Sequence, residues 1–151
     1  MKMWGMLSGW CDACQVQERR EPSVSRTKLI TGQDWCGEWL SYTDHGRNTM
    51  LNTREKFGKW TEGWATAFSD GRITNPQYID AGDIVVAQFT VEGTNNGPLG
   101  SMKPTGRKMS LPFCEICHFD KQGRIVSGGC YYDQYTLLTQ LGHIQPLAAA
   151  A

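Results

Sequence analysis

The chain has 151 residues, and its 15 basic and 15 acidic side chains give a formal net charge of +0. This length suits one domain with a core of its own. The neutral balance gives no excess of positive charge that would attract nucleic acid or an acidic membrane surface. The 40% hydrophobic content, with six Trp, five Tyr and five Phe, argues against disorder. No apolar run approaches the roughly 18–20 residues of a membrane span.

The N-terminal segment "MKMWGMLSGWCDAC" contains apolar residues at helical spacing, although Gly5 and Gly9 interrupt it. It lacks a clean signal-peptide cleavage site, so a cytoplasmic location is expected. "GQDWCGEWL" (32–40) repeats apolar residues in the same way and predicts a second helix. We therefore expect helices over residues 1–41, within a single domain spanning 1–151 that ends in a frayed tail at 147–151.

The cysteine pairs Cys11/Cys14 and Cys114/Cys117 have CxxC spacing, which is typical of zinc sites. About 100 residues separate the two pairs, where zinc sites usually have about 15–20. The second pair also falls in an expected strand, where residues three apart face opposite sides. Buried reduced thiols are the favoured interpretation, and neither a metal nor a cofactor is expected.

The middle of the chain predicts a helix followed by strands. Asn52 and Glu55 resemble a capping box, and the helix would end near Gly71. Period-two alternation then predicts strands in "TNPQYID", 84–93, "KMSLPFCEICHF" and "RIVSGGCYYD". "DKQG" predicts a hairpin turn, 94–107 a loop, and "QYTLLTQLG" a closing helix that ends at Gly142.

This order of helices followed by strands predicts an α+β fold. We expect a cone-shaped, curved antiparallel sheet packed on the N-terminal helices, as in a cystatin-like α+β barrel. The apolar interior of such a cone is a natural site for a small apolar ligand. Trp60 and Trp64 are expected in the core, where they can also contact a ligand.

Asp133 stands where the last strand meets the last helix. Alternation along the strand puts Asp133 on one face with Tyr131 and Gly129, and Cys130 and Tyr132 on the other. If the Asp133 face covers the interior, burial would raise the pKa of its carboxyl group and suit it to proton transfer. The alternative is a helix N-cap, in which the carboxylate binds free backbone N–H groups.

Other polar residues are candidates for the same interior. Glu115 and His118 lie on opposite faces of their strand, and the hairpin register decides which one faces inward. Gln88 and Asn95 are possible polar pocket groups. The segment "YTDHG" contains Tyr42 and His45, and adjacent Asp and His residues in a loop are typical of a turn.

The stretch from "AGDIVVAQFTVEG" to "YYDQYTLLTQLG" resembles the SnoaL-like polyketide cyclase and ester cyclase family, of the ketosteroid-isomerase-like superfamily. The matching pieces, in order, are "GD" before a strand, "EGT", "PTGRK", "GRIV" and an aspartate before "LLTQLG"; "YTDHG" and "FSDGRI" match earlier segments. Together they cover about residues 42–146.

The resemblance implies intramolecular aldol cyclisation or isomerisation without a cofactor, with Asp133 as the general acid/base. His118 is the nearest counterpart of a pocket histidine, and His45 matches a "DH" segment at the pocket mouth. Gly129 stands where the family commonly has a large aromatic residue, which implies a roomier pocket. Asn95 replaces a residue that is often histidine.

Two alternatives remain open beside this enzyme. One is a non-catalytic module that binds a small ligand on the same fold. The other is a hydrolase of the epoxide-hydrolase type, which needs a second carboxylate and an arginine: Glu115 or Asp44 with Arg107 or Arg124. A homodimer formed through the outer sheet face is compatible with each of these functions.

Overall fold

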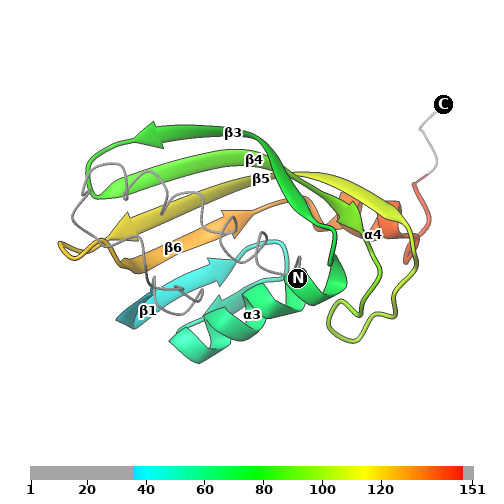
Figure 1. Cartoon of the computed structure of the whole chain (residues 1–151), viewed down its shortest axis with the longest axis horizontal. Helices are drawn as coiled ribbons and strands as arrows, with labels where there is room; N and C mark the ends of the chain where they lie inside the picture. Colours follow the sequence, from blue (N-terminus) through cyan, green and yellow to red (C-terminus); the bar gives the residue numbers. More distant parts are fainter. Residues whose placement is uncertain (1–35, 148–151) are drawn as a thin grey trace.

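The computed structural model describes residues 36–147 as two helices and one sheet (Figure 1). The elements in chain order are β1 (Cys36–Asp44), β2 (Thr49–Leu51), α3 (Arg54–Ala67), β3 (Arg72–Asp80), β4 (Ile84–Thr94), β5 (Lys108–Phe119), β6 (Ile125–Tyr131) and α4 (Gln134–Leu141). This arrangement confirms the α+β class. Neither described helix is long and apolar enough to cross a membrane.

The six strands form one curved sheet in the order β2-β1-β6-β5-β4-β3. All neighbours are antiparallel except β1 and β6, which run parallel. Within the described residues, the edge strands β2 and β3 do not pair with each other, so the sheet stays open. The closed barrel was therefore a wrong prediction, although the curved sheet itself is confirmed.

β1 replaces the second of the helices expected before residue 41. Cys36–Asp44 pairs with both β2 and β6, and Leu40, Tyr42 and Asp44 alternate into the core. The apolar spacing of 32–40 fits a helix as well as a strand, and long-range pairing with β6 decides between them. The helix expected near Met3–Cys14 and the Cys11/Cys14 pair lie outside the described residues.

α3 covers one face of the sheet, which is called the inner face below (Figure 1). Its N-cap is Thr53, whose hydroxyl accepts a hydrogen bond from the Lys56 N–H, rather than Asn52. The helix buries Phe57, Trp60 and Trp64 against the sheet, as its periodicity predicts. Trp64 meets the ring of Phe113 on β5 edge to face, with centroids 5.7 Å apart.

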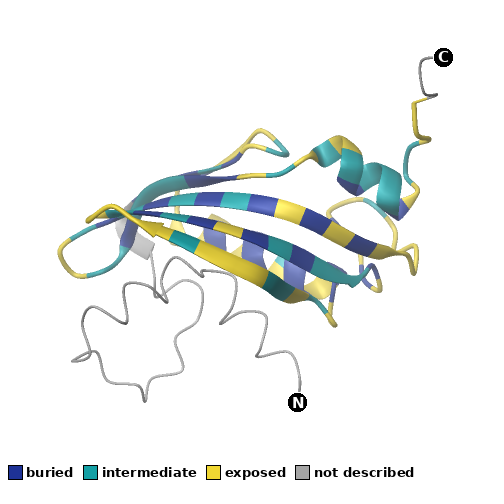
Figure 2. Ribbon diagram, turned by 90° about the horizontal axis from the view of Figure 1, so that it is seen from above, coloured by how far each residue is buried: buried dark blue, intermediate teal, exposed yellow. Residues whose placement is uncertain are grey.

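The strands β4, β5 and β6 lie close to where alternation predicts them. Burial alternates strictly along most of β5, with the residues from Met109 to Phe119 at every second position facing inward (Figure 2). The turn 120–123 is held by the Asp120 carboxylate, which accepts the Gln122 and Arg124 N–H groups. α4 ends at Gly142, whose left-handed φ of 77° makes glycine the favoured residue there.

Replacing Gly63 with Ala is expected to raise the thermal unfolding midpoint. Gly63 lies inside α3, and a Cβ there would meet no atom within 4 Å, while Ala is favoured over Gly in helices by about 1 kcal/mol. Gly97→Ala is the matched opposite, because its Cβ would lie 2.1 Å from the Thr66 carbonyl oxygen. Thermal unfolding followed by circular dichroism measures both; a higher midpoint for Gly97→Ala would contradict this packing.

Candidate active site

One row of side chains crosses the inner face from β1 to β4. The strand register pairs Asp44 with Cys130, Cys130 with Glu115, and Glu115 with Ala87. Residues paired in this way present their side chains on the same face, and all four are at most 2% exposed. Two carboxylates, Asp44 and Glu115, are therefore buried on one face with a cysteine between them.

Glu115 forms a short hydrogen bond with Tyr42. The Tyr42 hydroxyl donates to Glu115 Oε1 over 2.5 Å, and the tyrosine is completely buried. Burial, reinforced by the nearby Glu115 carboxylate, holds the pKa of Tyr42 well above its ordinary value. Tyr42 is therefore a protonated donor at neutral pH.

Asp44 is held by three hydrogen-bond donors. Trp60 Nε1 donates to Oδ2 over 2.7 Å and the Tyr132 hydroxyl donates to the same oxygen over 3.1 Å. The Arg47 backbone N–H donates to Oδ1 over 3.0 Å. Burial raises the pKa of Tyr132 above its ordinary value, although Arg47 acts in the opposite direction. These donors stabilise a buried carboxylate that would otherwise be costly to desolvate.

Cys130 lies between the two carboxylates. Burial raises the pKa of its thiol above the ordinary range, and the charges of Asp44 and Glu115 add to that shift. A thiol with a raised pKa stays protonated and is a poor nucleophile. Cys130 therefore fills space in the row as a neutral group.

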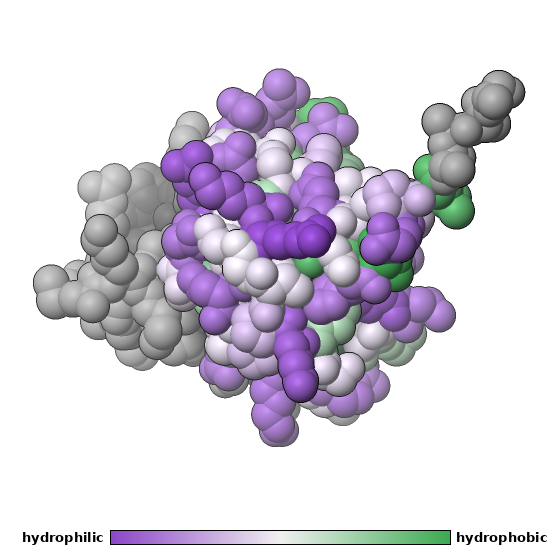
Figure 3. Space-filling view, turned by 90° about the vertical axis from the view of Figure 1, so that its right-hand side faces the viewer, coloured by the Kyte–Doolittle hydropathy of each residue, from purple (hydrophilic) through white to green (hydrophobic). Residues whose placement is uncertain are grey.

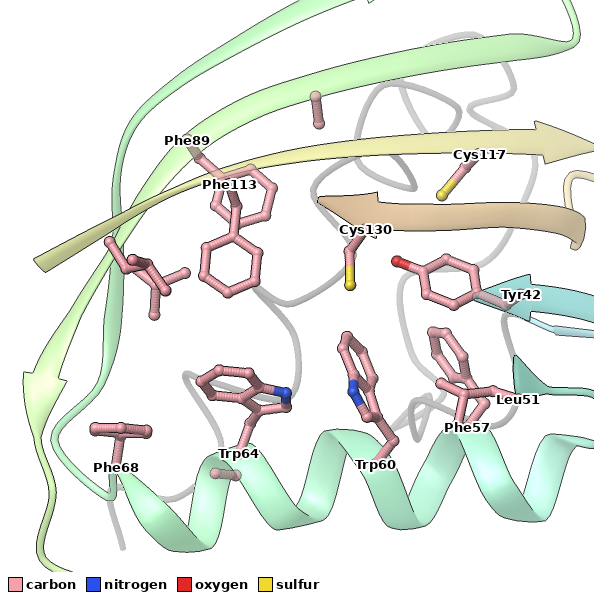
Figure 4. Close-up of a cluster of buried hydrophobic side chains, with 14 of the residues drawn as sticks. Tyr42, Leu51, Phe57, Trp60, Trp64, Phe68, Phe89, Phe113, Cys117 and Cys130 are labelled. Atoms are coloured by element: carbon pink, nitrogen blue, oxygen red, sulfur yellow. The ribbon is translucent and has the colours of Figure 1, made fainter. Parts of the chain in front are cut away.

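Aromatic rings lie beside Tyr42 and Cys130 on the inner face (Figure 4). Phe57 meets Tyr42 edge to face with centroids 5.0 Å apart, and Tyr132 stacks on Phe113 at 4.5 Å. Trp60 and Trp64 extend from α3 toward the sheet between them. Besides the hydrogen-bond donors of the two carboxylates and the Arg47 side chain next to Asp44, the row is bordered by these aromatic rings.

This arrangement suits proton transfer to and from an apolar molecule. A carboxylate in apolar surroundings can take and return a proton, and a fixed hydroxyl donor can stabilise a developing oxyanion. No group of three or more His, Cys, Asp or Glu side chains positioned to hold a metal ion occurs among residues 36–147.

Asp133 does not face this interior, so the expectation of an inward carboxylate is wrong. Its side chain caps α4: Oδ1 accepts the Tyr135 N–H over 2.9 Å and Oδ2 accepts the Thr136 hydroxyl over 2.5 Å. Asp133 is exposed, and the hydrogen bond from Thr136 lowers its pKa. The N-cap alternative is the one that the structure shows.

The face shared by Gly129 and Tyr131 is the outer face. Tyr131 is 44% exposed and stacks on the His45 ring with centroids 4.2 Å apart. A Cβ on Gly129 would lie 3.0 Å from the His45 ring. The space above Gly129 therefore holds His45 outside the sheet, and the expected widening of an interior pocket is wrong.

The register of the β5–β6 hairpin places Glu115 inward and His118 outward. His118 lies opposite Ile84 and Ser127 and is only partly buried. An interior position for His118 beside a catalytic carboxylate is therefore ruled out by the sheet register.

Gln88 and Asn95 lie away from the interior row. Gln88 is exposed and, with Tyr131, lines an outer-face groove of about 440 Å³. Asn95 is buried as a structural clamp: its amide donates to the Ala67 and Gly97 carbonyls, and its oxygen accepts the Thr105 N–H.

A second groove, of about 510 Å³, is lined largely by polar and charged residues, among them Asp70, Arg72 and Lys108. The end of the molecule that carries α4 is likewise mostly hydrophilic (Figure 3). Neither groove is lined by Tyr42, Asp44, Glu115 or Cys130.

The structure brings four of the candidate residues together: Tyr42, Trp60, Trp64 and Glu115; their contact with a ligand stays a prediction. It adds Arg47, Cys130 and Tyr132, to which sequence reasoning gave no place in a site, and Asp44, which was a candidate only as the second carboxylate of a hydrolase. Alternation through "LSYTD" was the available signal, because it puts Leu40, Tyr42 and Asp44 on one side of a strand.

The family model of the SnoaL-like polyketide cyclases matches residues 36–141 of the chain. This stretch covers every described strand and helix, including the row from Asp44 to Glu115. No curated protein sequence matches the chain.

Solved structures share the fold at low sequence identity. AclR, a proposed hydroxylase from Streptomyces galilaeus, superposes with a TM-score of 0.68 at 19% identity, covering 96% of this chain and 81% of AclR. A proposed SnoaL-like polyketide cyclase from Jannaschia also gives 0.68, at 16% identity and 97% and 86% coverage. A protein from Catenulispora acidiphila with a ketosteroid-isomerase-like fold, solved with trimethylamine, gives 0.63 at 19% identity and 76% and 85% coverage.

Replacing Asp133 with Ala is expected to lower the midpoint of thermal unfolding at neutral pH, because α4 loses its N-cap. Replacing it with Asn should keep most of the stabilisation that the cap provides. The folded-state pKa of Asp133 is lowered, so its stabilisation is present above the unfolded pKa of about 3.9 and is lost as pH falls through the folded pKa. Thermal unfolding of wild type and Asp133→Ala across acidic pH measures this. A midpoint difference that persists at the lowest pH would contradict capping by the carboxylate.

Proposed function

The chain belongs to the SnoaL-like polyketide cyclase family, and we propose that it is a cofactor-independent acid–base enzyme with Glu115 and Tyr42 at its centre. Its substrate would be an apolar, polyketide-like carbonyl compound that undergoes intramolecular aldol cyclisation or isomerisation. The observation that carries this proposal is the buried hydrogen bond between the Tyr42 hydroxyl and the Glu115 carboxylate.

In the proposed reaction, the Glu115 carboxylate removes a proton from the carbon next to a substrate carbonyl group. Once Glu115 is protonated, the single hydroxyl hydrogen of Tyr42, which the raised pKa of Tyr42 keeps in place, turns from Glu115 and donates a hydrogen bond to the enolate oxygen. The enolate carbon attacks a second carbonyl group to close the ring, and Glu115 returns its proton to the new alkoxide. In an isomerisation, the proton returns to a different carbon.

Asp44 has a different role in this proposal. Its Oδ2 atom already accepts hydrogen bonds from Trp60 and Tyr132, so this oxygen is engaged by donors of the protein itself. We assign Asp44 to orienting Tyr132 and Trp60 at the wall of the interior. The general acid/base role that the family resemblance implies for Asp133 is assigned to Glu115, because Asp133 is exposed and caps α4.

An epoxide-hydrolase type of activity is a second candidate, supported by one observation. Asp44 and Glu115 supply two carboxylates on the inner face, and the Arg47 side chain lies beside Asp44. Arg107 and Arg124 do not supply the arginine: Arg107 lies at the α4 C-terminus beside Gly142, and Arg124 pairs with Asp120. Conversion of styrene oxide to its diol would favour this candidate.

Glu115→Gln is expected to abolish proton abstraction by this protein. The measurement is deuterium exchange at the α-carbons of 2-tetralone, an apolar bicyclic ketone, in D₂O by proton NMR. The rate above buffer should fall by about 10²–10⁴-fold, the usual contribution of a general base. Tyr42→Phe should also slow exchange, because it removes the oxyanion donor.

Asp133→Asn is the matched control, since it neutralises a carboxylate outside the interior and retains a capping side chain. It is expected to keep the wild-type exchange rate. Exchange that survives in Glu115→Gln but is lost in Asp133→Asn would overturn the assignment. A wild type that binds 2-tetralone without exchanging it would favour a non-catalytic binding module.

A further inference from the structure

Arg47 brings a positive charge to the edge of the interior row. It lies in the turn between β1 and β2, and its side chain is only 26% exposed. The guanidinium carbon lies 4.6 Å from the centroid of the buried Trp64 ring. Since Trp64 packs among Phe68, Phe113 and Tyr132, the guanidinium extends into the aromatic interior.

The guanidinium has hydrogen-bonding capacity that the described part of the chain does not use. Its Nη2 atom is buried and has no hydrogen-bond partner among residues 36–147. A guanidinium carries five N–H donors in a fixed planar fork, and a buried donor without an acceptor is costly. The Arg47 fork therefore lacks an acceptor on the Nη2 side.

Asp44 does not supply this acceptor. The closest approach of the ion pair is 3.8 Å, between Arg47 Nε and Asp44 Oδ2, which is longer than a hydrogen bond. Both Asp44 oxygens already accept other donors, from Trp60, Tyr132 and the Arg47 backbone. Asp44 thus partly balances the charge of Arg47, while the Nη2 group of the guanidinium can still donate a hydrogen bond to a ligand.

We propose that Arg47 is a positioning residue that binds an anionic carboxylate of the substrate. This inference rests on the proposed function and narrows its substrate to apolar carbonyl compounds that carry an acidic group. A planar carboxylate matches the guanidinium fork, which forms two parallel hydrogen bonds with such a partner. The face of Trp64 restrains the guanidinium and so fixes the direction of the fork.

The sheet register separates this anchor from the proposed base. Asp44, beside Arg47, and Glu115 are two strand spacings apart, which is on the order of 10 Å. A carboxylate bound at Arg47 would lie far enough from Glu115 to limit repulsion between the two anions. The reacting carbon and the acidic group therefore lie at opposite ends of the substrate.

The test compares two ligands that differ only in charge, 2-naphthoate and its neutral amide, 2-naphthamide. Binding to the full chain is followed by tryptophan fluorescence. The wild type is expected to bind the carboxylate at least about tenfold more tightly than the amide, as a charge-assisted hydrogen-bond pair provides. Arg47→Met should reduce this ratio to about one or less, and Arg47→Lys should give an intermediate ratio because it lacks the fork.

Arg107→Met is the matched control, because it removes an arginine that is exposed beside Gly142, and it should keep the wild-type ratio. If Arg47→Met fails to fold because Asp44 loses its counter-charge, the double variant Asp44→Asn/Arg47→Met removes both charges and takes its place. An unchanged ratio in the Arg47 variants, or a wild type without preference for the carboxylate, would overturn the inference.

The same ligand pair separates this inference from the proposed function. Glu115→Gln is expected to keep the preference for 2-naphthoate while it loses exchange of 2-tetralone. If Glu115→Gln loses exchange of 2-tetralone and Arg47→Met keeps the wild-type ratio of affinities for 2-naphthoate and 2-naphthamide, only the role of Arg47 is overturned. A lost ratio in Arg47→Met, together with unchanged exchange in Glu115→Gln, overturns the proposed base and leaves the carboxylate site standing.

Discussion

The burial of two carboxylates on one face of the sheet is the constraint on which the rest of this structure depends. Removing a charge from water costs several kcal/mol unless hydrogen bonds and opposite charges replace the lost hydration. Here the replacements come from different elements: Tyr42 from β1, Trp60 from α3, Tyr132 from the segment after β6, and Arg47 from the β1–β2 turn. Burial of Glu115 therefore depends on β1, and burial of Asp44 depends on α3, the segment after β6 and the β1–β2 turn.

The parallel pairing of β1 with β6 makes this cluster possible. It sets Asp44 beside Cys130, which the antiparallel β5–β6 hairpin sets beside Glu115. A shift of one residue in either register would turn one carboxylate to the outer face. The hairpin register is fixed locally by its turn, whereas the parallel register joins segments more than 80 residues apart. The bulge between Cys36 and Ser41 lies in this long-range pairing.

Local patterns predicted the parts of the fold whose contacts are local. β4, β5, their hairpin partners and α4 follow from alternation and turn residues such as Gly142, and α3 follows from its helical periodicity. β1 was not predictable in the same way, because the spacing of Trp35, Cys36, Trp39 and Leu40 also fits a helix, and its pairing partner comes late in the chain. The two-residue period showed that Tyr131 and Tyr132 face opposite sides, but not which side α3 would cover.

The position of Asp133 shows why a sequence match alone cannot assign a proton-transfer role. A carboxylate that accepts a backbone N–H and a hydroxyl at a helix N-terminus is stabilised in its charged form, so its pKa falls. A general base near neutral pH needs the opposite environment, with apolar surroundings and few donors. Of Asp133 and Glu115, Glu115 has the more suitable surroundings, since it is buried and lies beside a tyrosine that stays protonated. In the proposed function, proton transfer therefore belongs to the middle of β5 rather than to the end of β6, while the aspartate before α4 caps the helix.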